Sequence, residues 1–224
     1  MVESELDVAG VRLRLLPHRA AFVPALRCLL IADAHLGKAV SFRRLGVPVP
    51  EATTAETLQR LSQAIHATAA EQVVFLGDLL HSARWRSAAT EAAVAQWRSE
   101  HEQLALTLVR GNHDSHAGDP PLAWRVQCLD GPLMLGGLAL SHHPEPRDDA
   151  YVLAGHTHPA ALVVGRGGDR LRLPCFHFGP QVGVLPAFGA FTGMHVMPRN
   201  PGDRVYVIGG DTVRALPQVA AHSV

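Results

Sequence analysis

The strongest constraint on the fold is a pattern that recurs along the chain: a short, mainly apolar run ends directly at a cluster of polar side chains. Three such runs span residues 28–32, 73–76 and 104–109, and their apolar character is typical of strands buried on both faces. Spacing and composition predict helices over 51–69 and 87–101 between them. Every polar cluster therefore falls at the carboxyl end of a strand, where open α/β sheets bind ligands.

Residues 110–114, Arg-Gly-Asn-His-Asp, form the densest of these clusters. The glycine permits a sharp turn after the strand, and an amide, an imidazole and a carboxylate follow at once. Such a group at the end of a strand indicates a site and not packing. Other clusters stand where further apolar runs end: Asp33-Ala-His35, Gly77-Asp78, His142 and Gly155-His156-Thr-His158.

The second half of the chain reads as strands and turns. After a loop at 116–121 we predict antiparallel strands at 125–129, 133–135 and 138–140, and further strands at 151–154, 161–164, 170–173, 187–191 and 204–208 with 212–215. Alternating apolar and basic residues predict an edge strand at 11–16. The predicted fold class is α/β, a two-sheet sandwich in a single domain, 1–224. Its C-terminal strands occupy 160–216, and a frayed tail follows at 217–224.

Composition excludes several classes of protein. The chain has 20 basic and 20 acidic residues, so no global field attracts nucleic acid or membranes, and such affinity must come from local patches. Three widely spaced cysteines without a CxxC pair indicate free thiols in a reducing compartment. The acidic N-terminal residues form no signal peptide, and no apolar run approaches the ~20 residues of a membrane helix. We therefore expect a cytoplasmic protein without membrane contact.

The side chains at the strand ends are nitrogen and oxygen ligands that suit Mn, Fe, Ni or Zn. Seven of them, too many for one tetrahedral centre, fit two metal ions that share a bridging carboxylate and activate water for attack at phosphorus. They are Asp33, His35, Asp78, Asn112, His142, His156 and His158. In Asp33-x-His35 and His156-x-His158, alternate residues of an extended segment point the same way, so each pair is expected to converge.

This ordered set of motifs, from residue 33 to residue 158, resembles the calcineurin-like metallophosphoesterases. The resemblance implies a four-layered α/β/β/α fold with mixed sheets and a centre of two divalent metal ions, with manganese expected before iron, zinc or nickel. It implies that one metal is held by Asp33, His35 and His158, and the other by Asn112, His142 and His156. Asp78 would bridge the two metals. By the same resemblance, His113 would protonate the leaving oxygen and Asp114 would orient the His113 ring.

A narrower resemblance rests on residues 31–38, Ile-Ala-Asp-Ala-His-Leu-Gly-Lys, and on Phe-Arg-x-x-Gly-x-x-Val-Pro at 42–50. These segments are similar to the bacterial ligase-associated DNA damage response endonucleases. That likeness implies hydrolysis of phosphodiester bonds in nucleic acid. It also implies a functional link to an ATP-dependent DNA ligase and a helicase. The neutral overall charge does not support strong duplex binding and favours a small or single-stranded substrate. The chain departs from many relatives at His81, where they have an acidic residue. We expect this imidazole to support the site or to contact substrate.

Several alternatives stay open at this stage. Lys38, Arg43 and Arg44 are either a solvated loop or a clamp for substrate phosphates. His142 is favoured over His143 as the metal ligand. Trp85 is expected to pack in the core or in a homodimer contact, with base stacking as its alternative. Rival functions are hydrolysis of small nucleotide esters without a repair role, or a metal-binding scaffold of low turnover in a repair assembly.

Overall fold

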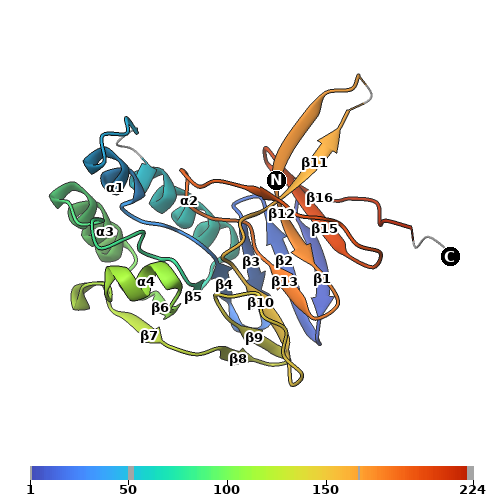
Figure 1. Cartoon of the computed structure of the whole chain (residues 1–224). Coiled ribbons are helices and arrows are strands. Elements are labelled where there is room, and N and C mark those ends of the chain that lie inside the picture. The colour runs from blue at the N-terminus through green and yellow to red at the C-terminus, as the bar shows by residue number, and fades with distance from the viewer. Residues whose placement is uncertain (1, 50–52, 166, 221–224) are drawn as a thin grey trace.

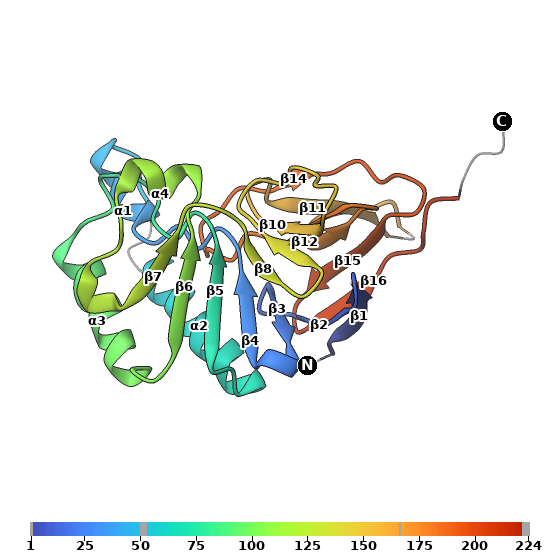
Figure 2. The same cartoon turned by 90° about the horizontal axis from the view of Figure 1, so that it is seen from below.

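The three apolar runs form parallel strands at the centre of the first of two sheets in the computed structural model, which describes residues 2–49, 53–165 and 167–220. They are β4 (Cys28–Ile31), β5 (Gln72–Leu76) and β6 (Ala105–Val109). The helices α2 (Thr53–Thr68) and α3 (Ala88–Glu100) connect them and pack on one face of the sheet (Figure 2). Both predicted helices are thus present, and the first two residues expected for α2, 51 and 52, lie outside the described residues.

The first sheet is extended on both sides of these strands. β1 (Ser4–Val8), β2 (Val11–Leu16) and β3 (Ala20–Val23) lead antiparallel into β4, and β7 (Val126–Leu129) joins β6 in parallel. The prediction that 11–16 is an edge strand was wrong, because β1 pairs outside it. The antiparallel prediction for the first run after the loop was also wrong, because β7 pairs with the neighbouring parallel strand.

The second sheet contains the C-terminal strands and packs face to face on the first (Figure 1). Its strands are β8 (Leu133–Leu135), β9 (Leu138–Leu140), β10 (Tyr151–Ala154), β11 (Pro159–Val164), β12 (Arg170–Phe178), β13 (Val182–Val184), β14 (His195–Val196), β15 (Arg204–Gly209) and β16 (Thr212–Ala215). β8 and β9 are antiparallel as predicted, whereas β9 and β10 run parallel. Both sheets are therefore mixed.

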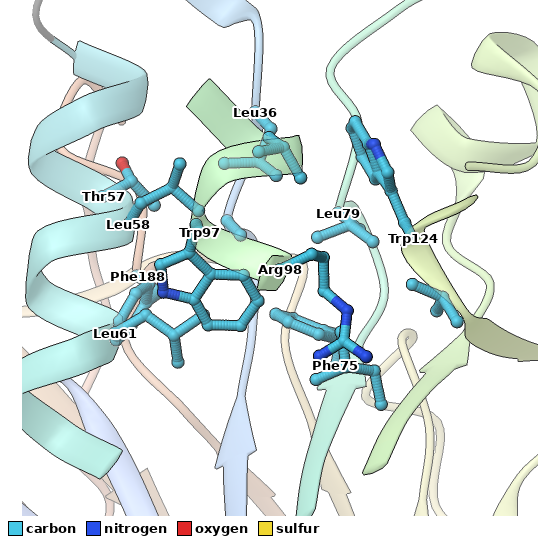
Figure 3. A pocket seen from close by; sticks show the side chains of 14 residues that line it. Leu36, Thr57, Leu58, Leu61, Phe75, Leu79, Trp97, Arg98, Trp124 and Phe188 are labelled. Atoms are coloured by element: carbon cyan, nitrogen blue, oxygen red, sulfur yellow. The ribbon is translucent and has the colours of Figure 1, made fainter. Parts of the chain in front are cut away.

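Two apolar layers hold the fold together. One lies between the sheets and includes the fully buried Leu13, Leu153 and Phe176. The other lies between the first sheet and its helices. Figure 3 shows Leu61 of α2, Trp97 of α3 and Phe75 of β5 directed into the same small space. The α/β class with two mixed sheets is confirmed. In the part of the chain that the structure describes, no α-helix follows Ala117, so strands and loops form the outer side of the second sheet.

Some local predictions differ from the structure. Residues 187–191 were predicted as a strand but form a loop, in which Ala187 makes one bridge to Ala32 and Phe188 fills the helix-side core. The apolar character of residues 187–189 reflects their burial within a loop. The helices α1 (Lys38–Arg44) and α4 (Asn112–Ala117) and the 3₁₀ turns Pro24–Leu26 and Leu122–Trp124 were not predicted.

The remaining predictions concern the tail and the membrane. Residues 217–220 form no helix or strand, and 221–224 lie outside the described residues. No helix among the described residues is both long and apolar enough to cross a bilayer.

Candidate metal centre and active site

All seven predicted ligands lie at the ends of strands, and the fold brings these ends together. Asp33 and His35 follow β4, Asp78 follows β5, and Asn112 opens the short helix after β6. The second sheet contributes its side chains from the segments after β9 and β10, which are His142, His156 and His158. Ligand atoms from both sheets therefore meet at one place.

One group of ligand atoms forms around His158. Its Nε2 atom lies 3.5 Å from Oδ1 of Asp33 and 3.4 Å from Nε2 of His35. The same nitrogen of His35 lies 4.0 Å from Oδ2 of Asp78. Asp33, His35 and His158 are the residues that the family resemblance assigned to one metal ion.

A second group forms around His142. Its Nε2 atom lies 2.9 Å from Oδ1 of Asn112, 3.0 Å from Nδ1 of His156 and 3.4 Å from Oδ1 of Asp78. Asp78 therefore directs one carboxylate oxygen to each group, which is the arrangement that a bridging ligand needs. His143 is exposed, and one of its ring nitrogens lies within 4.8 Å of those of His142 and His156, so it borders this group.

The donor atoms fit divalent cations. The Nδ1–H group of His142 donates to the carbonyl of Leu76 (3.1 Å), which leaves the lone pair of Nε2 facing the carboxylate of Asp78. Burial lowers the pKa of His142, and burial likewise lowers the pKa of His35 and of His156, so all three rings favour the neutral form that binds metals. Acceptor atoms that face one another repel, and a cation between them relieves this repulsion.

The backbone at the centre is unusual. Five of the seven predicted ligands have positive φ angles: Asp33 (55°), His35 (47°), Asp78 (52°), His156 (72°) and His158 (50°). A non-glycine residue in this region costs of order 1–3 kcal/mol and persists only where surrounding structure enforces it. The Asp-x-His and His-x-His pairs were expected to converge because their backbone is extended. That reason was wrong, because these four residues have left-handed backbone conformations, which set the directions of their side chains.

Two glycines make room for the ligands. A Cβ atom on Gly77 would lie 2.1 Å from Nδ1 of His142, and one on Gly111 would lie 2.3 Å from Oδ1 of Asp78. Gly111 was expected to provide a sharp turn, but its φ of −98° is open to any residue. Its value to the site is the absent side chain, which lets the strand end approach the carboxylate of Asp78.

His113 lies beside the two groups, with its Nε2 atom 3.9 Å from Oδ2 of Asp78 and its side chain partly exposed. Its Nδ1–H group donates to the backbone carbonyl of His81. Asp114 was predicted to orient this ring. Instead, its two buried carboxylate oxygens accept the N–H groups of Leu80 and Gly111, both at 2.9 Å. Asp114 joins the segments after β5 and β6, and the carbonyl of His81 orients the His113 ring.

The four residues predicted to contact substrate lie on or near α1. Lys38 and Arg43 are half-buried, Arg44 is exposed, and the ring of His81 stacks on that of His113 with 4.9 Å between centroids. Arg43 donates to the carbonyl of Val49 (3.2 Å) and Arg44 to that of Arg86 (2.9 Å), so both are tied to local backbone.

Trp85, for which base stacking was the alternative, is fully buried and packs on Trp124 with 5.2 Å between ring centroids. It belongs to the core.

Two features were missed from sequence, the carbonyls of Leu76 and His81 that fix the tautomers of His142 and His113. A backbone carbonyl leaves no signal in the sequence. The one available indication was that each predicted motif follows its strand directly, which places strand-end carbonyls near the rings.

Comparisons with known proteins place this geometry in context. The sequence model of the family described as calcineurin-like phosphoesterase matches residues 26–160. Among solved structures, the nuclease MPE of Pseudomonas putida is 42% identical, covers 96% of this chain and 100% of its own, and has a TM-score of 0.82. The E. coli phosphoesterase YfcE is 15% identical, covers 86% of this chain and 98% of its own, and has a TM-score of 0.41. No sequence of a curated protein matches the chain.

Proposed function

Because the chain belongs to the calcineurin-like phosphoesterase family, we propose that it cuts phosphodiester bonds in nucleic acid at a centre of two divalent metal ions. The observation that supports this most directly is the position of Asp78. One of its oxygens faces Asn112, His142 and His156, and the other faces the side of His35. A carboxylate shared between two sets of nitrogen and oxygen ligands is suited to two cations and not to one.

The proposed roles follow from the geometry of the chain's own residues. Bound metal ions would supply a Lewis acid for the phosphoryl oxygens and an activated water. His113 would supply the proton, because the carbonyl of His81 keeps Nδ1 protonated and leaves Nε2 directed toward the centre. Donation from Nε2 requires the imidazolium form of His113. Asp114 would act by holding the two strand-end segments in register.

The substrate and its setting are further parts of the proposal. The Pseudomonas putida protein of 42% identity is a nuclease, which supports nucleic acid over small esters. Zero formal charge argues against strong binding to duplexes and favours single strands. Manganese is the proposed metal, because the family resemblance favours it and the donor set includes the carboxylate and amide oxygens that Mn²⁺ binds. The likeness of residues 31–50 to the ligase-associated endonucleases supports a role in repair beside a DNA ligase and a helicase.

The test is hydrolysis of an aryl phosphodiester and of a single-stranded oligonucleotide, each with Mn²⁺. The wild-type protein should cleave both, and Asp78→Ala should lose at least 10³-fold in rate because both metal groups lose a ligand. Arg214→Ala on β16 is a matched surface control and should keep full activity. Absence of cleavage by the wild-type protein with Mn²⁺, Fe²⁺, Zn²⁺ and Ni²⁺ would overturn the enzymatic proposal and favour a metal-binding scaffold. Cleavage of the aryl ester alone would favour small nucleotide esters.

A further inference from the structure

A row of aromatic rings leads outward from the centre. The ring of His113 stacks on His81, with 4.9 Å between centroids and 21° between planes. His81 lies 5.8 Å from the ring of Phe42, and Phe42 meets Phe191 edge to face at 5.7 Å. The row begins at the proposed proton donor and ends in solvent, where the side of Phe191 is exposed.

The two phenylalanines come from distant parts of the chain. Phe42 lies on α1, directly before Arg43 and Arg44, and Phe191 lies in the loop between β13 and β14. Phe191 also shares a small cavity with His35 and Lys38, which places this loop against the metal side of the site.

Core packing does not account for the exposed ring. Phe188, three residues earlier, is 0% exposed and fills the helix-side core, whereas Phe191 is 40% exposed. An aromatic ring left in water costs free energy that its burial against a partner would recover. Its place in a cavity shared with His35 and Lys38 puts it within reach of a substrate bound at the proposed site.

We propose that Phe42 and Phe191 form a nucleobase-binding subsite, in which a base next to the cut phosphodiester stacks on the exposed face of Phe191. A base has an apolar π-face that stacks on aromatic side chains whatever its sequence. Arg43 and Arg44 follow Phe42 directly on α1 and are the cations proposed for the flanking phosphates. The edge-to-face contact with Phe42 holds the ring of Phe191 in place. This inference rests on the proposed function and adds the part of the substrate, the base, that the metal centre does not recognise.

The first test compares two single-stranded oligonucleotides of equal length and charge, one with bases throughout and one with abasic residues around the cut bond. The metal-loaded wild-type protein should cleave the base-bearing strand at least tenfold more efficiently in kcat/KM. Phe191→Ala should remove this preference by slowing cleavage of the base-bearing strand alone. Leu162→Ala on β11 removes an apolar side chain of similar exposure, 46%, and should change neither rate.

The second test does not depend on turnover. A strand with one 2-aminopurine between phosphorothioate linkages reports stacking by loss of its fluorescence. The metal-loaded wild-type protein should quench it, Phe191→Ala should not, and Phe191→Trp should restore quenching. Phe42→Leu, which keeps the volume but removes the supporting ring, should quench less than the wild-type protein.

The outcomes separate the subsite from the proposed function. Equal cleavage of base-bearing and abasic strands by the wild-type protein, or equal losses on both in Phe191→Ala, would overturn the subsite and leave the phosphodiesterase intact. Cleavage of neither strand and of no aryl phosphodiester would overturn the proposed function and the subsite with it.

Discussion

At the scale of single residues, His113 differs from the other histidines of the site. Its ring comes no closer than 3.9 Å to the carboxylate of Asp78, a predicted ligand, and its backbone N–H donates to that carboxylate at 3.0 Å. We predict that His113→Ala keeps two metal ions per chain and loses about 10²- to 10⁴-fold in kcat, the usual contribution of a positioned general acid. Metal content by mass spectrometry and rates on an aryl phosphodiester measure the two effects. Loss of metal in this variant would make His113 a ligand.

Asp114 gives a prediction about stability, because both of its oxygens are buried against backbone N–H groups. Burial raises the pKa of its carboxyl from 3.8 to about 6. The folded state therefore favours the protonated acid, so this group stabilises the fold most below pH 3.8 and its contribution is lost as pH rises through about 6. The loss amounts to roughly 3 kcal/mol.

The measurement for Asp114 is the free energy of unfolding of metal-free protein between pH 4 and pH 7. The difference between wild-type protein and Asp114→Asn should shift in favour of the variant as pH rises, since an amide has no charge to bury. Parallel curves for the two proteins over this range would show that Asp114 titrates normally.

Residue identities at the centre were predictable, and the local backbone was not. The order of the motifs and the preference of metals for imidazole and carboxylate indicated which side chains would gather. The sequence of Asp33-Ala-His35 contains no signal for two left-handed residues, because local propensity disfavours them. Hydrogen bonds to residues distant in the sequence enforce these conformations; for example, the N–H group of His35 donates to the carbonyl of Asp78 at 2.9 Å.

At the scale of elements, the turn after β5 depends on Gly77. Its φ is +77°, and an added Cβ would lie 2.1 Å from the ring of His142. Gly77→Ala should therefore lower the free energy of unfolding by roughly 3 kcal/mol and weaken metal binding. Gly10→Ala is the matched control, with the same left-handed backbone (+78°) and open space around it, and should cost about 1 kcal/mol. Denaturant titration and Mn²⁺ calorimetry distinguish the clash from the strain, and equal losses in the two variants would rule out the clash.

The strands that carry the three cysteines also determine how fast each thiol reacts. Cys28 on β4 and Cys175 on β12 are buried, and burial raises the pKa of each to about 12. Cys128 on β7 is half-buried. In native protein at pH 8, Ellman's reagent should modify Cys128 first and leave the other two unreacted, because thiolate formation and access are both needed. All three should react in urea. Rapid native reaction of more than one thiol would contradict the burial of these strands.

One strand that was missed and one that was wrongly predicted have the same cause. Ser4–Val8 alternates correctly, with Leu6 and Val8 buried, but its acidic residues made it read as a polar end of the chain. Residues 187–191 are apolar and the first three are buried, yet their backbone forms a β-bridge only at Ala187. Periodicity reports which side chains are buried, whereas strand pairing depends on which backbone lies alongside, and that is set by the whole sandwich.

At the scale of the whole molecule, equal numbers of basic and acidic residues leave affinity for nucleic acid to local clusters. The helix α1 is such a cluster, because it carries Lys38, Arg43 and Arg44 and no acidic residue, and because Lys38 lies beside His35. With so few cations, the affinity for nucleic acid should be modest, and substitution of any one of them should lower it clearly.

The salt dependence of single-strand binding tests whether the cations of α1 contact the phosphates. For single strands, log K falls with log[salt] by about 0.7 for each neutralised phosphate, so three cations predict a slope near −2. Arg43→Ala and Arg44→Ala should each reduce the slope by about 0.7, whereas Arg214→Ala on β16 should leave it unchanged. Fluorescence anisotropy of a labelled strand, in the His113→Ala background so that the strand stays intact, gives the slopes. A slope near zero, or one that Arg214→Ala lowers equally, would mean that α1 does not hold the substrate backbone.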